Sequence, residues 1–271
     1  MYAGTTFRHH SGNIVGVHQR IDRVARKHLV KHLPGVYFPT TKEILHFEGK
    51  NGPDGIKSKS PSVDEPWHFI NPKAGIDDPL VLMINDHIVN LRTALQEKNE
   101  VRAAFEAAWL AHAVVDGLTP AHHVPLAEKI EELWGKAHHE RNSVRDKALI
   151  KGINRRDTLS KNWEYWGSKG VFSAHVFYEM GIASAITTTK FTEVGLHALD
   201  FALIEEFGFA QYFMTSVEEV DALHTYQDFI EKGWNQKLGN TVRRQLIPII
   251  IKNVALAWYA AAHGVETEKQ S

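Results

Sequence analysis

The sequence predicts an all-α protein, organised as a single-domain multi-helix bundle over residues 1–271. Apolar residues recur three and four positions apart along most of the chain, which is the period of an amphipathic helix. Runs that alternate polar and apolar residues, as half-buried strands do, are scarce, and no change in composition marks a domain boundary. We therefore expect a single core enclosed by about eight to ten helices.

The first expected helix covers about 14–25, where Ile14, Ile21 and Ala25 share an apolar face, and the Pro34-Gly35 pair ends the helical stretch. Further helix-period runs follow along the chain. They cover about 79–98, 100–116, 124–139, 168–187, 192–206, 209–232 and 235–263. The last contains LIPIIIKNVALAWYAAAH, which is either a central core helix or a surface for a partner, and we favour the core helix.

Two segments interrupt the helical pattern. Residues 48–78 are rich in glycine and proline but also contain Trp67 and Phe69, so we expect a long ordered loop and not a free linker. Residues 151–167, with three aromatic side chains near their end, predict a second aromatic-rich connection. Long loops inside compact domains are usually functional, so both segments are candidates for the walls of a site.

Composition excludes several kinds of chemistry. Lys and Arg total 31 against 32 Asp and Glu, so the chain lacks the global positive charge typical of non-specific nucleic-acid binding. The absence of cysteine excludes disulfides, thiolate zinc sites and cysteine nucleophiles, so any metal must be held by nitrogen and oxygen. The 17 histidines favour such a site, since imidazole is the commonest metal ligand.

The N-terminal residues lack the uninterrupted apolar core of a signal peptide, and no later run reaches the length expected of a membrane-spanning helix. As written, the sequence predicts a cytoplasmic protein without a transmembrane segment. A secreted protein whose leader has been removed would also fit.

A histidine followed four residues later by an acid places both side chains on one helix face, where they can bind one metal or each other. The pattern occurs four times, as His18/Asp22, His112/Asp116, His175/Glu179 and His224/Asp228. Chance accounts for part of this number, so the surrounding residues must discriminate among the pairs.

His112 and Asp116 lie in AAFEAAWLAHAVVDG, which is apolar on nearly every side, and His175 lies in VFSAHVFYEMGIASAI, which is similar. A buried imidazole or carboxylate must be paired, neutralised or bound to metal, because leaving it alone costs several kcal/mol. His224 lies in a polar stretch that indicates a solvated face. His18 falls on the apolar stripe of its helix, whereas Asp22 is expected to point away from that stripe.

Simpler interpretations remain open from the residues alone. A buried histidine is more often a hydrogen-bonded core residue than a ligand, and a His/acid pair one turn apart can satisfy itself. Asp54, in NGPDG, is a typical turn residue, and His68 can be an ordinary loop histidine. The aromatic residues near the pairs are most simply core packing; they are Trp109, Phe172, Phe177 and Tyr178.

Taken together, the order of these residues resembles the ligand set of the zinc-dependent phospholipase C family and, more distantly, the related single-strand-specific zinc nucleases. HAVVDGLTPAH is similar to the family's H-x3-D-x5-H core, WHFINP to its HF-containing loop, and HVFYE to its H-x3-E. The resemblance covers about residues 14–180. It implies an all-α, phospholipase C/nuclease-like fold that holds two or three zinc ions in a cleft.

The resemblance also implies a role for each ligand. One zinc would be held by Asp54, His68, His112 and Asp116, a second by His122, His175 and Glu179, and a third by His18 with Asp116 as a bridge. Asp54 would in addition orient the attacking water as a base. Exported family members complete the third site with an N-terminal tryptophan, whereas this chain begins Met1-Tyr2, so His9 and His10 are alternative ligands.

The implied activity is that of a phosphoric ester hydrolase, namely a phospholipase C-like phosphodiesterase that uses a zinc-activated water. Its substrate partner would be a phospholipid headgroup or a nucleotide, with transient contact to a membrane surface in the first case. Trp67, Phe69 and the aromatic residues at 163–166 would form cleft walls. Two alternatives stay open: a nuclease of the related single-strand-specific type, and a non-catalytic helical protein that binds zinc.

Overall fold

A computed structural model shows how the chain folds. It describes residues 16–33, 35, 37–48, 51–53, 69–124, 126–136, 140, 149–192 and 194–265. All regular secondary structure within these ranges is helical, and they contain no strand. The prediction of an all-α multi-helix fold is therefore confirmed.

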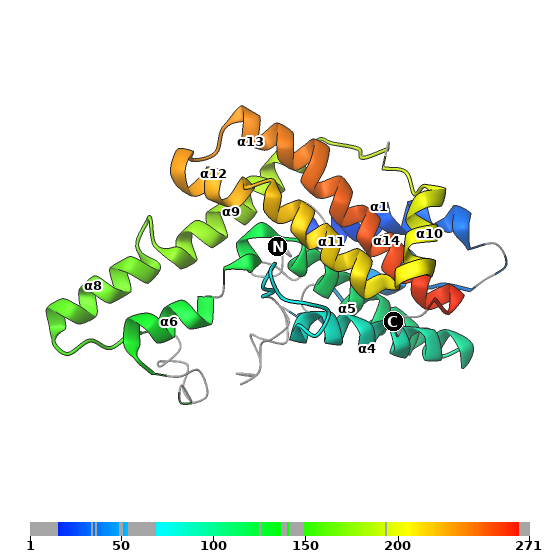
Figure 1. The fold of residues 1–271 in the computed structure, drawn as a ribbon, viewed down its shortest axis with the longest axis horizontal. Helices are drawn as coiled ribbons and strands as arrows, with labels where there is room; N and C mark the ends of the chain where they lie inside the picture. The colour runs from blue at the N-terminus through cyan, green and yellow to red at the C-terminus, as the bar shows by residue number, and fades with distance from the viewer. Residues whose placement is uncertain are drawn as a thin grey trace.

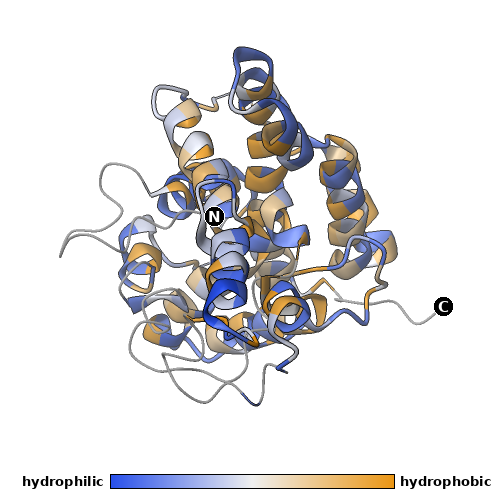
Figure 2. Ribbon diagram, turned by 90° about the vertical axis from the view of Figure 1, so that its left-hand side faces the viewer, coloured by the Kyte–Doolittle hydropathy of each residue, from blue (hydrophilic) through white to orange (hydrophobic). Residues whose placement is uncertain are grey.

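The centre of the bundle is formed by α1 (Val17–Leu29), α4 (Pro79–Gln96), α5 (Glu100–Gly117) and α14 (Ile247–His263), which pack against one another (Figure 1). Figure 2 shows the strongest hydrophobic colours on the inner helices. The alanine-rich α5 is buried along most of its length, because small side chains let its neighbours approach closely. Trp258 of α14 is fully buried, and its indole N–H donates to the Ala107 carbonyl of α5 at 2.8 Å.

The outer helices include α2 (Thr41–His46), α9 (Val171–Ile186) and α10 (Ala198–Phe207). The run predicted as one helix at 209–232 forms two, α11 (Phe209–Ala222) and α12 (Thr225–Lys232). They are divided at His224, whose φ of 50° is left-handed and cannot continue a helix. The hydrophobic period alone does not reveal such a break.

The chain from Gln236 to His263 forms one continuous 28-residue helix. It consists of α13 (Gln236–Thr241), the π-helical turn η6 (Val242–Leu246) and α14, and η6 lies just before Pro248, which has no N–H to donate to the preceding turn. By length and composition this helix could cross a membrane, so the expectation that no run reaches that length is wrong. Its most apolar window is 67% buried inside the protein, as expected of a core helix.

A separate arm projects to one side of the bundle and consists of α6 (Leu126–Trp134) and α8 (Arg155–Trp166) (Figure 1). Its inner faces share a small cluster of Ile130, Ile150 and Tyr165, distinct from the main core. The prediction of a connection without a helix at 151–167 is wrong. Asn154 caps α8 by accepting from the Asp157 N–H at 2.9 Å. Tyr165 is the one residue of α8 that is buried, and the apolar residues that recur at helical spacing, Leu159, Trp163 and Trp166, are exposed. The segment therefore does have a helical period, on a face turned to solvent and not to the core.

Gly117 ends α5 in close contact with α4 and α11, and we expect Gly117→Ala to destabilise the protein. A Cβ there would lie 2.7 Å from Phe213 Cζ and 2.8 Å from Leu80 Cδ2. Overpacking of this kind costs about 1–3 kcal/mol of unfolding free energy, measurable by urea denaturation. Gly239→Ala is the matched control, because its Cβ would meet no atom closer than Trp234 Nε1 at 3.7 Å. That change should add about 0.5–1 kcal/mol through helix propensity, and an equal loss in both variants would contradict the argument.

Candidate metal centre

The last two turns of α5 carry the first part of the site. His112 and Asp116 are 2% and 1% exposed, and one helical turn brings His112 Nε2 to 3.3 Å from Asp116 Oδ2. The apolar sequence around His112 and Asp116 therefore correctly indicated that both side chains are buried. A carboxylate in such a position needs compensating partners, because it has lost its hydration.

Helix α1 supplies the next partner. His18 is fully buried, and its Nε2 lies 3.3 Å from Asp116 Oδ1. The His18 and His112 rings stack with their centroids 4.1 Å apart and their planes 14° from parallel. Asp116 therefore faces one imidazole on each oxygen. We call His18, His112 and Asp116 the first triad; their donor atoms all lie within 4.8 Å of one another.

A second triad consists of His122, His175 and Glu179. α5 ends at Gly117, Thr119 donates its hydroxyl to the Val115 carbonyl at 2.7 Å, and the short 3₁₀ helix η4 (Pro120–His123) then places His122. His122 Nε2 lies 3.0 Å from Glu179 Oε1. His175 Nε2, one turn before Glu179 on α9, lies at the same 3.0 Å distance from that oxygen.

The two triads meet at Asp116, since His122 Nδ1 lies 3.7 Å from its Oδ2. Zinc binds nitrogen and oxygen at about 2.0–2.1 Å in tetrahedral geometry, which separates neighbouring ligand atoms by about 3.3–3.4 Å. The contacts within the triads measure 3.0 and 3.3 Å, which is at or slightly below that separation. Both groups could therefore hold a metal ion, and small shifts would suffice to coordinate it.

The electrostatics of the site suit a cation. Burial lowers the pKa of His122 to about 3, so at neutral pH its imidazole is uncharged and offers a lone pair. Burial tends to raise the pKa of Asp116, but the His122 and His112 imidazoles outweigh it and hold that pKa well below its ordinary value. The Glu179 carboxyl behaves in the same way, with hydrogen bonds to His122 and His175 lowering its pKa against burial. Neutral imidazoles and ionised carboxylates are the forms that bind metals.

Six of the eight sequence-predicted ligands are thus brought together. The remaining two, Asp54 and His68, lie outside the described residues, as do His9, His10 and Trp67, so their predicted roles stay predictions. The described end of the 48–78 loop does reach the second triad. The Phe69 ring centroid lies 5.5 Å from that of His122, nearly stacked, and 6.5 Å from that of His175.

Two acids near the first triad differ from expectation. Asp22 was expected to point away from the apolar face, but it is 1% exposed, which corrects that interpretation. It is covered because α2 packs against α1 and brings Glu48, itself 5% exposed, into the interior. Glu48 Oε1 lies 3.6 Å from His112 Nδ1. The four-residue spacing between His18 and Asp22 could have indicated that Asp22 lies near the site. No pattern in the local sequence indicates the same for Glu48.

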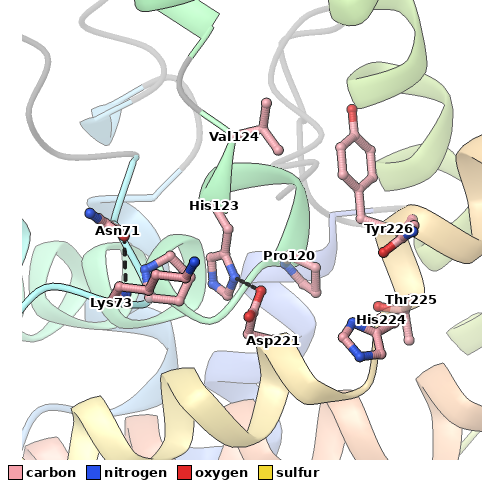
Figure 3. A pocket seen from close by; sticks show the side chains of 11 residues that line it. Asn71, Lys73, Pro120, His123, Val124, Asp221, His224, Thr225 and Tyr226 are labelled. Atoms are coloured by element: carbon pink, nitrogen blue, oxygen red, sulfur yellow. Dashed lines mark hydrogen bonds and ion pairs between the residues drawn. The ribbon is translucent and has the colours of Figure 1, made fainter.

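The fourth His/acid pair is on the surface, as predicted: His224 is exposed, and Asp228 pairs with Lys232 at 2.5 Å. His224 also lines a pocket of about 380 Å³ on the outer side of η4, together with His123, Asp221 and Tyr226 (Figure 3). His123 donates from Nε2 to the Gly117 carbonyl at 3.0 Å and has Nδ1 3.4 Å from Asp221 Oδ1. This pocket adjoins the second triad, because α12, which carries Tyr226, contacts both η4 and α9. Burial and then the Glu179 carboxylate raise the pKa of Tyr226 to about 12.

The aromatic side chains near the pairs differ in burial. Tyr178 is fully buried, as core packing predicts, but Phe177 is 53% exposed, so its interpretation as a core residue is wrong. Trp109 and Phe172 are partly buried and pack against the main core and the arm cluster, respectively.

Fold and site together define an all-α protein with two adjoining His/carboxylate triads that could each hold a metal ion. Comparison of the chain with protein-family models, with curated proteins and with solved structures gives no match. The function must therefore be argued from the triads themselves.

We expect His175→Ala and Glu179→Ala each to lower the zinc content by about one ion per chain, because each leaves the second triad with two ligands. His112→Ala should empty the first triad instead. Elemental analysis after zinc repletion and gel filtration measures the content. The control is the surface variant His224→Asn, because asparagine tolerates the left-handed φ of this position. It should keep the zinc content of the native protein. Native metal content in all three triad variants would exclude both sites.

We expect Asp22→Asn to stabilise the chelator-treated, metal-free protein, and increasingly so as pH rises. Burial and then the Glu48 carboxylate raise the pKa of Asp22 well above its ordinary value, and neither oxygen accepts a hydrogen bond from the described residues. The folded state therefore resists an ionisation that the unfolded state undergoes above about pH 4. The native protein therefore loses folding free energy as the pH rises from the unfolded-state pKa of Asp22 to its higher folded-state pKa. The gain at about pH 7 should exceed about 1 kcal/mol, because a tenfold change in proton affinity corresponds to about 1.4 kcal/mol.

Urea denaturation at about pH 4 and about pH 7 measures this effect. Asp86→Asn, on the exposed side of α4, is the control and should leave stability unchanged at both values. A gain for Asp22→Asn that shrinks as pH rises would contradict the proposed origin.

Proposed function

We propose that this protein is a zinc-dependent phosphoric ester hydrolase of the phospholipase C type. The observation that carries the proposal is the joining of two triads through Asp116, whose Oδ2 lies 3.3 Å from His112 Nε2 and 3.7 Å from His122 Nδ1. Metal ions held a few ångströms apart are the arrangement that phosphodiesterases and phosphatases use. The order of ligands along the chain supports the same proposal.

The donor set favours zinc over harder cations. Each triad offers two imidazoles and one carboxylate, whereas magnesium and calcium prefer oxygen ligands throughout. Three protein ligands leave one position of a tetrahedral ion for water or substrate, which is the mark of a catalytic zinc site. Zinc bound there would lower the pKa of a water to about 7 and stabilise charge on the attacking and leaving oxygens.

Residues of the chain would orient the ligands, exclude water and accept a proton. Asp116 orients His18 and His112 from its two oxygens, and Glu179 orients His122 and His175 from Oε1. Phe69 covers the rings of the second triad and restricts the entry of water there. Asp54 is proposed as the base that accepts the proton of the attacking water, a role that comes from the resemblance alone.

The two triads differ in access, which suggests where the substrate binds. All three residues of the first triad are buried, whereas Glu179 of the second is only partly so. A fully enclosed ion is typical of a structural site, and an accessible one of catalysis. We therefore place the substrate phosphate at the second triad, with the first supporting it. A nuclease acting on the same bond would use the same groups.

We expect the zinc-loaded protein to hydrolyse a soluble phosphodiester such as p-nitrophenyl phosphorylcholine, and to lose the activity on chelation and regain it with zinc. Glu179→Gln should lower kcat/KM at least about 100-fold, because it removes a charged ligand of the ion that contacts substrate. Asp228→Asn, which removes an acid from the exposed part of α12, is the matched control and should keep native activity.

Bis-p-nitrophenyl phosphate and single-stranded DNA, assayed in parallel, separate the phospholipase from the nuclease alternative. A protein that retains two zinc ions but cleaves none of these esters would be the non-catalytic helical zinc-binding protein.

A further inference from the structure

The arm carries an exposed apolar surface that the metal centre does not explain. Among the described residues, the three most exposed large apolar side chains are Ile153, Leu159 and Trp163, at 91%, 72% and 71%. They lie within eleven positions of one another, at the start of α8 and along it. Single exposed apolar residues are ordinary, but a group of this kind on a projecting element marks an interaction site.

These side chains do not belong to an incompletely packed core. Leu159, Trp163 and Trp166 are spaced by four and three residues, so they share one face of α8. Tyr165 lies on the opposite side, where it is 3% exposed and packs in the cluster with Ile130 and Ile150. The helix therefore already has one face buried in the arm. The stripe of Leu159, Trp163 and Trp166 is a separate apolar face that is exposed to solvent.

Basic side chains accompany the stripe. Arg155 and Arg156 begin α8 one turn before Leu159 and are exposed, as are Lys151 and Lys169. The segment 149–170 contains five basic and two acidic residues, although the whole chain has a net charge of −1. One of the acids, Asp157, is engaged locally by Lys161 at 3.1 Å and by the Ile153 N–H at 2.8 Å. The surplus of positive charge is thus confined to residues 149–170, because α6, the other helix of the arm, has three acidic residues and one lysine.

We propose that this face of the arm, formed by Ile153, Leu159, Trp163 and Trp166 with Arg155 and Arg156, docks on an anionic phospholipid membrane. Tryptophan prefers the interface between headgroups and acyl chains, where its apolar ring and its N–H are both accommodated. Leucine and isoleucine beside it insert into the acyl boundary, and the flanking cations contact anionic headgroups. A nucleic acid would not require the aliphatic residues.

The arm is connected directly to the second triad. α8 ends at Trp166, and α9, which carries His175 and Glu179, begins five residues later. Trp166 contacts Phe172 in the first turn of α9, with ring centroids 4.6 Å apart. Docking would therefore hold the second triad near the lipid surface; this last step rests on the proposed function, because it names a membrane phospholipid as the ester.

Co-sedimentation of the full zinc-loaded chain with vesicles tests the proposal. We expect binding to vesicles of phosphatidylcholine mixed with phosphatidylserine, and much weaker binding to phosphatidylcholine alone. Leu159→Ser combined with Trp163→Ser should weaken binding at least about tenfold, because two apolar side chains lose their insertion. Arg155→Glu combined with Arg156→Glu should weaken binding to the anionic vesicles at least about tenfold, through the loss of contact with anionic headgroups.

The matched control is Val101→Ser combined with Leu199→Ser, two side chains exposed by 69% and 67% on α5 and α10, outside the arm. It should bind vesicles as the native chain does. Circular dichroism and zinc content measured on every variant ensure that only folded, loaded protein is compared.

Absence of vesicle binding by the native chain would overturn the proposal, and so would equal binding by the Leu159/Trp163 variant. A native dimer that this variant dissociates, without any vesicle binding, would assign the face to a second copy of the chain instead. Zinc content and hydrolysis of the soluble ester are measured separately. Vesicle binding without either would leave the docking surface standing and remove the proposed hydrolase.

Discussion

The burial of the Asp116 carboxylate is the constraint on which the rest of the site depends. Each oxygen faces an imidazole at 3.3 Å, and a third imidazole approaches Oδ2 at 3.7 Å. Removing an ionised carboxylate from water is unfavourable unless its partners are close and oriented. Three elements must therefore converge on this one side chain: the end of α5, η4, which follows α5 directly, and α1, which is distant in sequence.

The bundle is built so that this convergence is possible. Alanines along α5 allow α4 and α14 to pack tightly, and the buried hydrogen bond from Trp258 to the Ala107 carbonyl fixes α14 against α5. α5 then stops at Gly117, where a larger residue would clash with Phe213. The turn that follows brings His122 back toward Asp116, so the end of the helix is as important for the site as the helix itself.

The two triads differ in their access to solvent. The first triad is enclosed by α1, α5 and the buried acids Asp22 and Glu48, and it is shielded from solvent. The second lies beneath Phe69 and beside the pocket of His123 and Tyr226, so it is nearer to solvent. The arm, which leads directly into α9, extends this more accessible side of the molecule. The proposed docking surface is thus connected through α9 to the triad proposed to bind the substrate.

The sequence by itself determined the helical class, most helices and the two His/acid pairs on α5 and α9, because a helix imposes a fixed period on local residues. The prediction failed for α8, whose apolar residues at helical spacing face solvent and not the core, and for Asp22, whose burial comes from α2 and not from its own helix. Only the tertiary structure decided that His18 and His112 stack on one carboxylate and that Glu48 joins them. These contacts join residues far apart along the chain, and packing between helices, which no local pattern encodes, sets their distances.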